Sequence, residues 1–246
     1  MCSPNGARAI ITINTSRPPF DDARVRAALS LAIDRETIAE KILRAGEQPA
    51  YSLVPPGIAD YPGTARFPYA GQPLDQRVAE AKRLLAEAGF GPENPLSFKF
   101  NYIADPDSRR VAVALGQMWQ AIGVSADLVL SEKKVHYNTV RVRDYEVAES
   151  NWFADYNDAK NFLFLAQPSS GAMNTSAYAN MEYENLISQA DATADAAARA
   201  ALLTKAEQLM LDEHPLVPLY FGVNRALIGT HVEGWVDNIV NVHRTR

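Results

Sequence analysis

The sequence predicts an α/β fold in which helices flank a mixed sheet. Residues 96–130 read as strand, helix and strand, the crossover that places two strands in parallel. Segments 8–14 and 216–221 are rich in β-branched or aromatic residues and read as further strands. Stretches 181–190 and 195–213 read as helices, the second rich in alanine, which favours helix.

The first part of the chain predicts capped helices and one irregular segment. Asp21 and Asp22 offer an N-cap, and a second helix is expected to follow Asp34 and stop near Gly46. Residues 47–74 hold six prolines, and their apolar residues recur at no regular helical or strand spacing. We therefore expect this segment to be an ordered loop that wraps over the surface, called the wrap below. Its apolar anchors are Tyr51, Leu53, Val54, Ile58, Tyr61, Phe67 and Tyr69.

The crossover region carries clear boundary signals. Asp75 is expected to cap a helix that ends at Gly89. Apolar residues alternate through 96–102, as in a strand with one buried face. Asp105 then starts a helix that Gly123 closes, and a second alternating strand follows.

The second half continues the α/β pattern. A short strand is expected at 145–150 and a helix at 158–166, before a polar, turn-rich stretch at 167–180. The strands at 216–221 and 226–228 close the fold. The chain shows no internal repeat.

Composition narrows the class of function. The net charge of −5 makes nucleic acid an unlikely partner, because phosphate binding needs a concentrated excess of Lys and Arg. The lone cysteine, Cys2, can form neither an intramolecular disulfide nor a metal cluster. No apolar run approaches the roughly 18 residues that a membrane span needs.

Catalytic and metal motifs are absent from the sequence. The histidines show no ligand spacing, and there is no nucleophile elbow or glycine-rich phosphate loop, so we expect no metal site and no cofactor. The histidines are His136, His214, His231 and His243. His214 precedes Pro215 at a helix end, where it is expected to interact with the helix dipole.

One segment stands out as a candidate site. Trp152, Phe153 and Tyr156 surround a single carboxylate, Asp155, at a junction from strand to helix. Ligands of open α/β sheets bind at the carboxyl ends of strands. A carboxylate walled by aromatic rings suits a cationic ligand group.

Two other interpretations remain open from the residues alone. Asp155, Asn157 or Asp158 could simply cap the following helix. Asp155 and Glu149 could form the carboxylate pair of a hydrolase, although nothing else in the sequence supports an enzyme. A calcium loop starting at Asp155 would lack the glycine at its sixth position and the glutamate at its twelfth.

Several long segments resemble the oligopeptide/dipeptide family (family 5) of extracellular solute-binding proteins. The longest runs from Asn14 to Glu36, and Ala79 to Gly89 resembles a helix of the family. Trp152 to Asp158 resembles its W-x-A-D-Y-x-D segment, and Tyr178 to Leu186 and Glu207 to Tyr220 match in order and spacing. The resemblance covers nearly the whole chain.

The resemblance implies a binding protein of an ABC importer, not an enzyme. Members have two lobes joined by a hinge, and the ligand is trapped between them before transfer to the membrane permease complex. Residues 1–246 resemble one ligand-binding lobe of a type II-like, Venus-flytrap periplasmic-binding-protein fold, with strands at 1–14 and about 224–246 near the hinge. The N-terminal lobe is absent, so the chain is expected to be a truncated fragment, with Cys2 incidental.

The same resemblance implies a location and ligand contacts. The protein is expected in the periplasm or outside the cell, with its signal peptide in the missing half. Asp155 would pair with the free α-amino group of a short peptide, and the backbone of Trp152 to Ala154 would bind it like a neighbouring strand. Phe153 and Tyr156 belong to this segment, and Phe221 and Gly222 match a strand that reaches the cleft.

The sequence leaves the ligand class open within the family. Glu149 stands where some relatives have an arginine that helps to hold the ligand, which puts peptide length and charge in doubt. Non-peptide ligands of the family include opines, nickel chelates, haem and oligosaccharides. Asp155 favours a ligand with a free amine, which disfavours sugars and metals but leaves opines possible.

Overall fold

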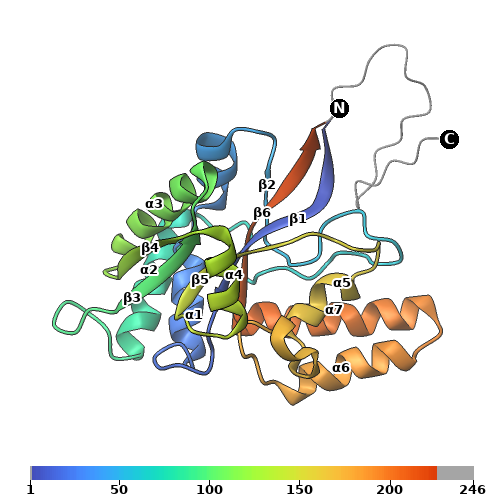
Figure 1. The fold of residues 1–246 in the computed structure, drawn as a ribbon. Coiled ribbons are helices and arrows are strands. Elements are labelled where there is room, and N and C mark those ends of the chain that lie inside the picture. Colours follow the sequence, from blue (N-terminus) through green and yellow to red (C-terminus); the bar gives the residue numbers. More distant parts are fainter. Residues whose placement is uncertain (1, 226–246) are drawn as a thin grey trace, which may run out of the picture.

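The computed structural model describes residues 2–225, whose strands form a six-stranded sheet in the order β2-β6-β1-β5-β3-β4 (Figure 1). Strand β3 runs parallel to β4 and β5, whereas β1 runs antiparallel to β5 and β6. The predicted mixed sheet is therefore confirmed. The strands are β1 (Cys2–Ile13), β2 (Gln48–Pro49), β3 (Ser97–Ile103), β4 (Ser125–Ser131), β5 (Val147–Trp152) and β6 (Leu216–Arg225).

Helices gather in two groups around the sheet. Helices α1, α2 and α3 lie on one side of the molecule, and α6 and α7 lie together on the other (Figure 1). The helices are α1 (Ala23–Leu31), α2 (Leu74–Glu87), α3 (Pro106–Gln120), α4 (Lys133–Arg141), α5 (Lys160–Leu163), α6 (Met181–Ala192) and α7 (Ala196–Glu213). Within residues 2–225, no helix has the length and apolar character that a membrane crossing requires.

The predicted crossover is present as β3, α3 and β4. The Asp105 carboxylate accepts hydrogen bonds from the backbone N–H groups of Asp107 and Ser108, so it caps α3 as expected. Trp119 on α3 is fully buried and packs edge-on against Phe98 and Phe100 of β3, with ring centroids 5.3 Å apart in both pairs. This aromatic contact fixes α3 against the parallel strands.

The proline-rich segment 47–74 is an ordered wrap, as predicted. Its apolar anchors are buried, except for the half-buried Tyr51. The buried Glu207 carboxylate of α7 accepts hydrogen bonds from Leu53 N at 2.7 Å and Val54 N at 2.8 Å, and it also contacts the Tyr61 hydroxyl. One carboxylate thereby ties the wrap to a helix more than 140 residues away in sequence.

Some predicted boundaries are wrong. Helix α2 begins at Leu74, so Asp75 lies in its first turn and does not cap it. The helix after Asp34 is a π-helix, Thr37–Leu43, and it stops before Gly46 because Arg44 already adopts the left-handed conformation, with φ of 58°.

The strands also differ from the prediction. Strand β5 runs on to Trp152, and residues 216–225 form a single strand. The predicted strand at 226–228, and most of the one at 224–246, lies outside the described residues. Helix α4 was not predicted at all, and it forms one wall of the candidate site.

His214 interacts with the end of α7, as predicted, because its Nδ1 donates a hydrogen bond to the carbonyl oxygen of Asp212 at 3.0 Å. The residue ends α7, with φ of 56°. The imidazole is buried, however, and stacks on Phe67 with ring centroids 5.1 Å apart. Burial lowers the pKa of His214 to about 3, so the ring is neutral at pH 7 and supplies no charge to the helix dipole.

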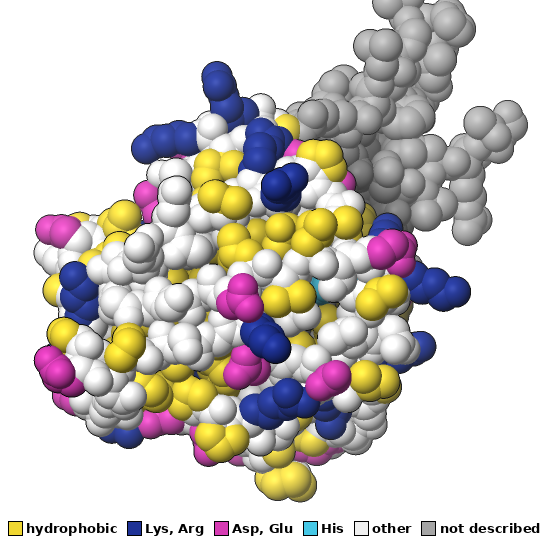
Figure 2. Space-filling view, turned by 60° about the vertical axis from the view of Figure 1, so that its left-hand side comes forward, with side chains coloured by type: hydrophobic (Ala, Val, Ile, Leu, Met, Phe, Trp, Pro, Cys, Tyr) yellow, Lys and Arg dark blue, Asp and Glu magenta, His cyan; other side chains and the backbone are white. Residues whose placement is uncertain are grey.

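Hydrophobic side chains are partly exposed on the side formed by α3, β4 and α4. Figure 2, which brings this side forward, shows them in several groups between charged side chains. The larger exposed ones on these elements are Val113, Leu130, Val135 and Tyr137. Scattered exposure of this kind is normal for a protein surface.

Candidate functional site

The site begins where β5 ends, at Trp152. This residue is in register with Arg8 of β1, and its side chain is half-buried. The indole N–H donates to Asn161 Oδ1 at 2.9 Å, and the ring packs edge-on against Phe164 at 5.1 Å between centroids. Trp152 is thereby fixed by α5 and the turn that follows it.

Asp155 lies on the loop beyond this strand end. Its backbone N–H donates to the same Asn161 Oδ1, at 3.2 Å. Its side chain is exposed, and within residues 2–225 the carboxylate has no hydrogen-bond or ion-pair partner. The backbone of Asp155 is held in place while its charge is left open to solvent.

The capping role that the sequence left open falls to Asp158. Its carboxylate accepts the backbone N–H of Lys160 at 2.8 Å, and it pairs with Arg199 of α7 at 2.9 Å. Asn157 accepts the backbone N–H of Ala59 at 3.0 Å, which joins this loop to the wrap. Asp155 therefore has no part in starting the helix.

The other predicted residues fall into two groups. Phe153 and Tyr156 are exposed by 66% and 50%, and Ala154 between them is half-buried. Phe221 is buried on β6 and, like Trp152, is in register with Arg8 of the intervening strand β1. Gly222 follows it and is half-buried. The sheet thus brings Trp152 and Phe221 into one row.

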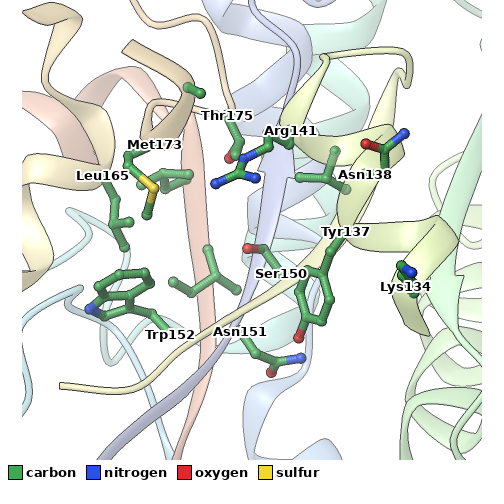
Figure 3. A pocket seen from close by; sticks show the side chains of 14 residues that line it. Lys134, Tyr137, Asn138, Arg141, Ser150, Asn151, Trp152, Leu165, Met173 and Thr175 are labelled. Atoms are coloured by element: carbon green, nitrogen blue, oxygen red, sulfur yellow. The ribbon is translucent and has the colours of Figure 1, made fainter. Parts of the chain in front are cut away.

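A cavity of about 600 Å³ adjoins Trp152 (Figure 3). Trp152, Leu165 and Met173 line one side, and residues of α4 line the other, with Ser150 and Asn151 of β5 between them. Of the residues predicted from sequence, Trp152 alone lines it. The full lining is Ile10, Lys134, Tyr137, Asn138, Val140, Arg141, Ser150, Asn151, Trp152, Leu165, Ala172, Met173, Thr175 and Leu216.

Glu149 and Asp155, the carboxylate pair of the hydrolase hypothesis, do not interact in the structure. Glu149 is buried, and its carboxylate accepts hydrogen bonds from Ile103 N at 3.0 Å and Ser108 Oγ at 2.6 Å. These partners draw Glu149 toward β3 and α3, and neither its carboxylate nor that of Asp155 bonds to the other. The Glu149 carboxylate also accepts a hydrogen bond from the side chain of Asn151 at 3.4 Å, so it joins β5 to β3 and α3.

His136 fixes α4 against β5. It is fully buried, and its Nε2 lies 2.8 Å from the carbonyl oxygen of Glu149. Burial lowers the pKa of His136, so the ring is neutral at pH 7 and donates this hydrogen bond as an ordinary N–H group. The α4 wall of the cavity is thus attached to the strand that ends in Trp152.

Known proteins resemble the chain over most of its length. Residues 3–174 match the model of the "Bacterial extracellular solute-binding proteins, family 5 Middle". The periplasmic oligopeptide-binding protein OppA of Escherichia coli is 36% identical over 224 residues, which are 91% of this chain and 41% of that protein. The probable deoxycholate-binding periplasmic protein YgiS of the same species is 34% identical, over 90% of this chain and 41% of its own length.

Solved structures show the same arrangement. OppA of Burkholderia pseudomallei superposes with a TM-score of 0.89 at 35% identity, over 96% of this chain and 46% of that one. OppA of Haemophilus influenzae, in complex with the peptide RPPGFSPFR, gives 0.86 at 33% identity, over 91% of this chain and 44% of that one. The chain spans less than half the length of each of these relatives. It belongs to the bacterial extracellular solute-binding proteins of family 5.

Proposed function

We propose that the chain is the ligand-binding lobe of a periplasmic protein that captures short peptides for an ABC importer. The peptide is held by its free α-amino group at Asp155 and by the backbone of Trp152 to Ala154, which pairs with it like an added strand. Closure of a hinge traps the ligand, and the membrane permease complex receives it. The protein carries out no chemistry on the ligand.

The open carboxylate of Asp155 is the observation that carries the proposal. Asp158 and Glu207 are engaged within the fold, whereas the Asp155 carboxylate is exposed and has no partner within residues 2–225. A carboxylate kept free of partners on a fixed backbone is available to an ammonium group. A charge-assisted hydrogen bond of this kind is worth roughly 1.5–3 kcal/mol.

A second lobe completes the proposed site. The chain covers 41% of the length of OppA from Escherichia coli, and β1 and β6 run side by side as a pair beyond the last residue of β5. We place the hinge at these two strands, so residues 1–246 make up one lobe. The exposed Phe153 and Tyr156 then face the ligand and the opposite lobe.

A non-peptide ligand is the second candidate. It is favoured by the relative named as a probable deoxycholate-binding protein, and by the apolar side of the cavity, which Trp152, Leu165 and Met173 form. A steroid acid would lie along this side without needing Asp155. Opines, which carry an amine, would still use it.

Native mass spectrometry of the full-length protein, purified without denaturation, distinguishes these ligands. The proposal predicts co-purified species whose masses and fragments fit peptides of a few residues with free N-termini. A bound steroid acid, haem, sugar or metal chelate would contradict it. Incubation with synthetic peptides should return them intact, since shortened products would indicate a hydrolase.

A further inference from the structure

We propose that Asn161 is a positioning residue, which holds Trp152 and Asp155 in the arrangement that the ligand meets. This inference rests on the proposed function, because it concerns how the amine anchor is presented. The side-chain oxygen of Asn161 accepts the indole N–H of Trp152 at 2.9 Å and the backbone N–H of Asp155 at 3.2 Å. One atom thus joins the end of β5 to the loop that carries the carboxylate.

The chemistry of these two contacts assigns the orientation of the Asn161 amide. Both partners are N–H groups, which can only donate, so the oxygen of the amide faces them and the nitrogen does not. A carbonyl oxygen has two lone pairs, and two donors therefore use its full capacity. The residue is 1% exposed, so both hydrogen bonds are made in a site shielded from water. Two donors that share one buried oxygen must lie close to each other.

Asn161 is itself attached to a fixed part of the fold. It belongs to α5, where the next residue, Phe162, is fully buried. The preceding residue, Lys160, forms an ion pair with Asp191 of α6. Helix α5 also packs against α7 (Figure 1). The acceptor oxygen therefore keeps its place when the loop before it moves.

The loop has little else to hold it at the charged residue. Within residues 2–225, Asp155 forms no hydrogen bond other than the one to Asn161. The next attachment along the loop is Asn157, which accepts the backbone N–H of Ala59 at 3.0 Å. Without the Asn161 oxygen, the loop would stay joined to the wrap but would be free at the residue that carries the charge.

This arrangement prepares the amine anchor before the ligand arrives. A carboxylate on a fixed backbone loses less conformational freedom on binding than one on a loose loop, so more of its interaction energy appears as affinity. An apolar side chain in place of Asn161 would release Asp155 and would leave the Trp152 indole N–H without its acceptor. Asn161 thereby contributes to ligand affinity through the two residues that it orients.

The chain offers a matched control for a purely structural role. Asn14 is a buried amide of the same kind, 1% exposed, which donates to the backbone carbonyl groups of Arg143 and Tyr145. It lies at the opposite end of β5, since Ile13 is in register with Val147. Asn14→Leu removes buried hydrogen bonds as Asn161→Leu does, but at a distance from the ligand site.

Calorimetry of the full-length protein with Ala-Ala-Ala and N-acetyl-Ala-Ala-Ala tests the inference. The parent should bind the free peptide at least about tenfold more tightly than the acetylated one. Asn161→Leu should reduce this preference to less than about threefold, because ordering the loop offsets the charge-assisted hydrogen bond. Asn161→Asp retains an acceptor oxygen and should retain the preference, and so should Asn14→Leu.

NMR of the 246-residue protein follows the same two hydrogen bonds without a ligand. In the parent, the Asp155 amide should exchange with solvent more slowly than in an unstructured chain, although its side chain is exposed. In Asn161→Leu this exchange should quicken and the Trp152 indole signal should shift, whereas Asn14→Leu should leave both unchanged. Trp152→Phe assigns the indole signal. An unprotected Asp155 amide in the parent would overturn the inference even if Asn161→Leu does not fold.

Two calorimetric results would also overturn it. One is a preference in Asn161→Leu equal to that of the parent, and the other is an equal loss of preference in Asn14→Leu, which would indicate general destabilisation. Both leave the proposed function in place, because the parent still prefers the free amine. If the parent binds the two peptides alike, Asp155 is not the amine anchor, and the proposed function and this inference are both wrong.

Discussion

Asn161 sets the geometry of the candidate site. Its side-chain oxygen accepts the indole N–H of Trp152 and the backbone N–H of Asp155, and the residue is 1% exposed. A single buried amide thus fixes both the aromatic wall and the loop that presents the carboxylate. The sequence picks out Trp152 and Asp155 as an unusual cluster. It does not pick out Asn161, whose role depends on the path of the loop between them.

His214 should make the stability of the protein depend on pH. Its folded-state pKa of about 3 lies below the value near 6.5 of an unfolded chain. The unfolded state therefore takes up a proton below about pH 6.5 that the folded state does not. The stabilisation is complete above that pH and is lost as the pH falls toward 3, by about 1.4 kcal/mol per pH unit.

Urea denaturation of the parent and of His214→Asn at pH 7, 6 and 5 measures this effect. Asparagine tolerates the left-handed conformation of this position and does not titrate. Between pH 7 and pH 5, the free energy of unfolding of the parent should fall by about 2 kcal/mol more than that of the variant. The buried His136 is common to both proteins and cancels in the difference. A difference in stability that stays constant with pH would show that His214 is not the titrating group.

At the scale of elements, Glu207 joins the proline-rich wrap to α7. Its replacement in Glu207→Gln keeps the size and one acceptor oxygen for Leu53 N–H and Val54 N–H, but it removes the charge that strengthens these bonds and places an amide nitrogen opposite the Tyr61 hydroxyl. We expect a loss of about 2–4 kcal/mol in the free energy of unfolding. Hydrogen exchange should quicken at the amides of Leu53 and Val54. Glu93→Gln, at an exposed loop position, is the control and should change neither quantity.

Helices and strands whose apolar residues recur at a regular spacing could be predicted from the sequence. The cavity could not be predicted. Apolar and polar residues alternate along both strands of the crossover at 96–130. Asp105 and Asp22 cap α3 and α1, as the sequence predicts. Helix α4 has only His136 and Val140 buried, too few apolar positions to give a helical pattern. The cavity draws on β1, β5, β6, α4 and the turns after α5, and no local pattern indicates that these segments meet.

At the scale of the whole molecule, the proposed function makes the site of this chain one half of a two-lobed clamp. Phe153 and Tyr156 are exposed beside Asp155, and the chain is 41% of the length of OppA from Escherichia coli. We therefore expect calorimetry of the 246-residue protein with short peptides to show no micromolar binding, because the second lobe supplies the remaining contacts. Micromolar or tighter binding would mean that this lobe holds a complete site.

Calorimetry of the full-length protein with a free and an N-acetylated tripeptide, before and after Asp155→Asn, tests the central claim most directly. The parent should bind the free peptide at least about tenfold more tightly, as a charge-assisted hydrogen bond of roughly 1.5–3 kcal/mol requires. The variant should bind both peptides weakly and alike, whereas Asp127→Asn, which removes an exposed charge from β4, should behave as the parent does. Equal binding of the two peptides by the parent, or a preference that persists in Asp155→Asn, would contradict Asp155 as the amine anchor.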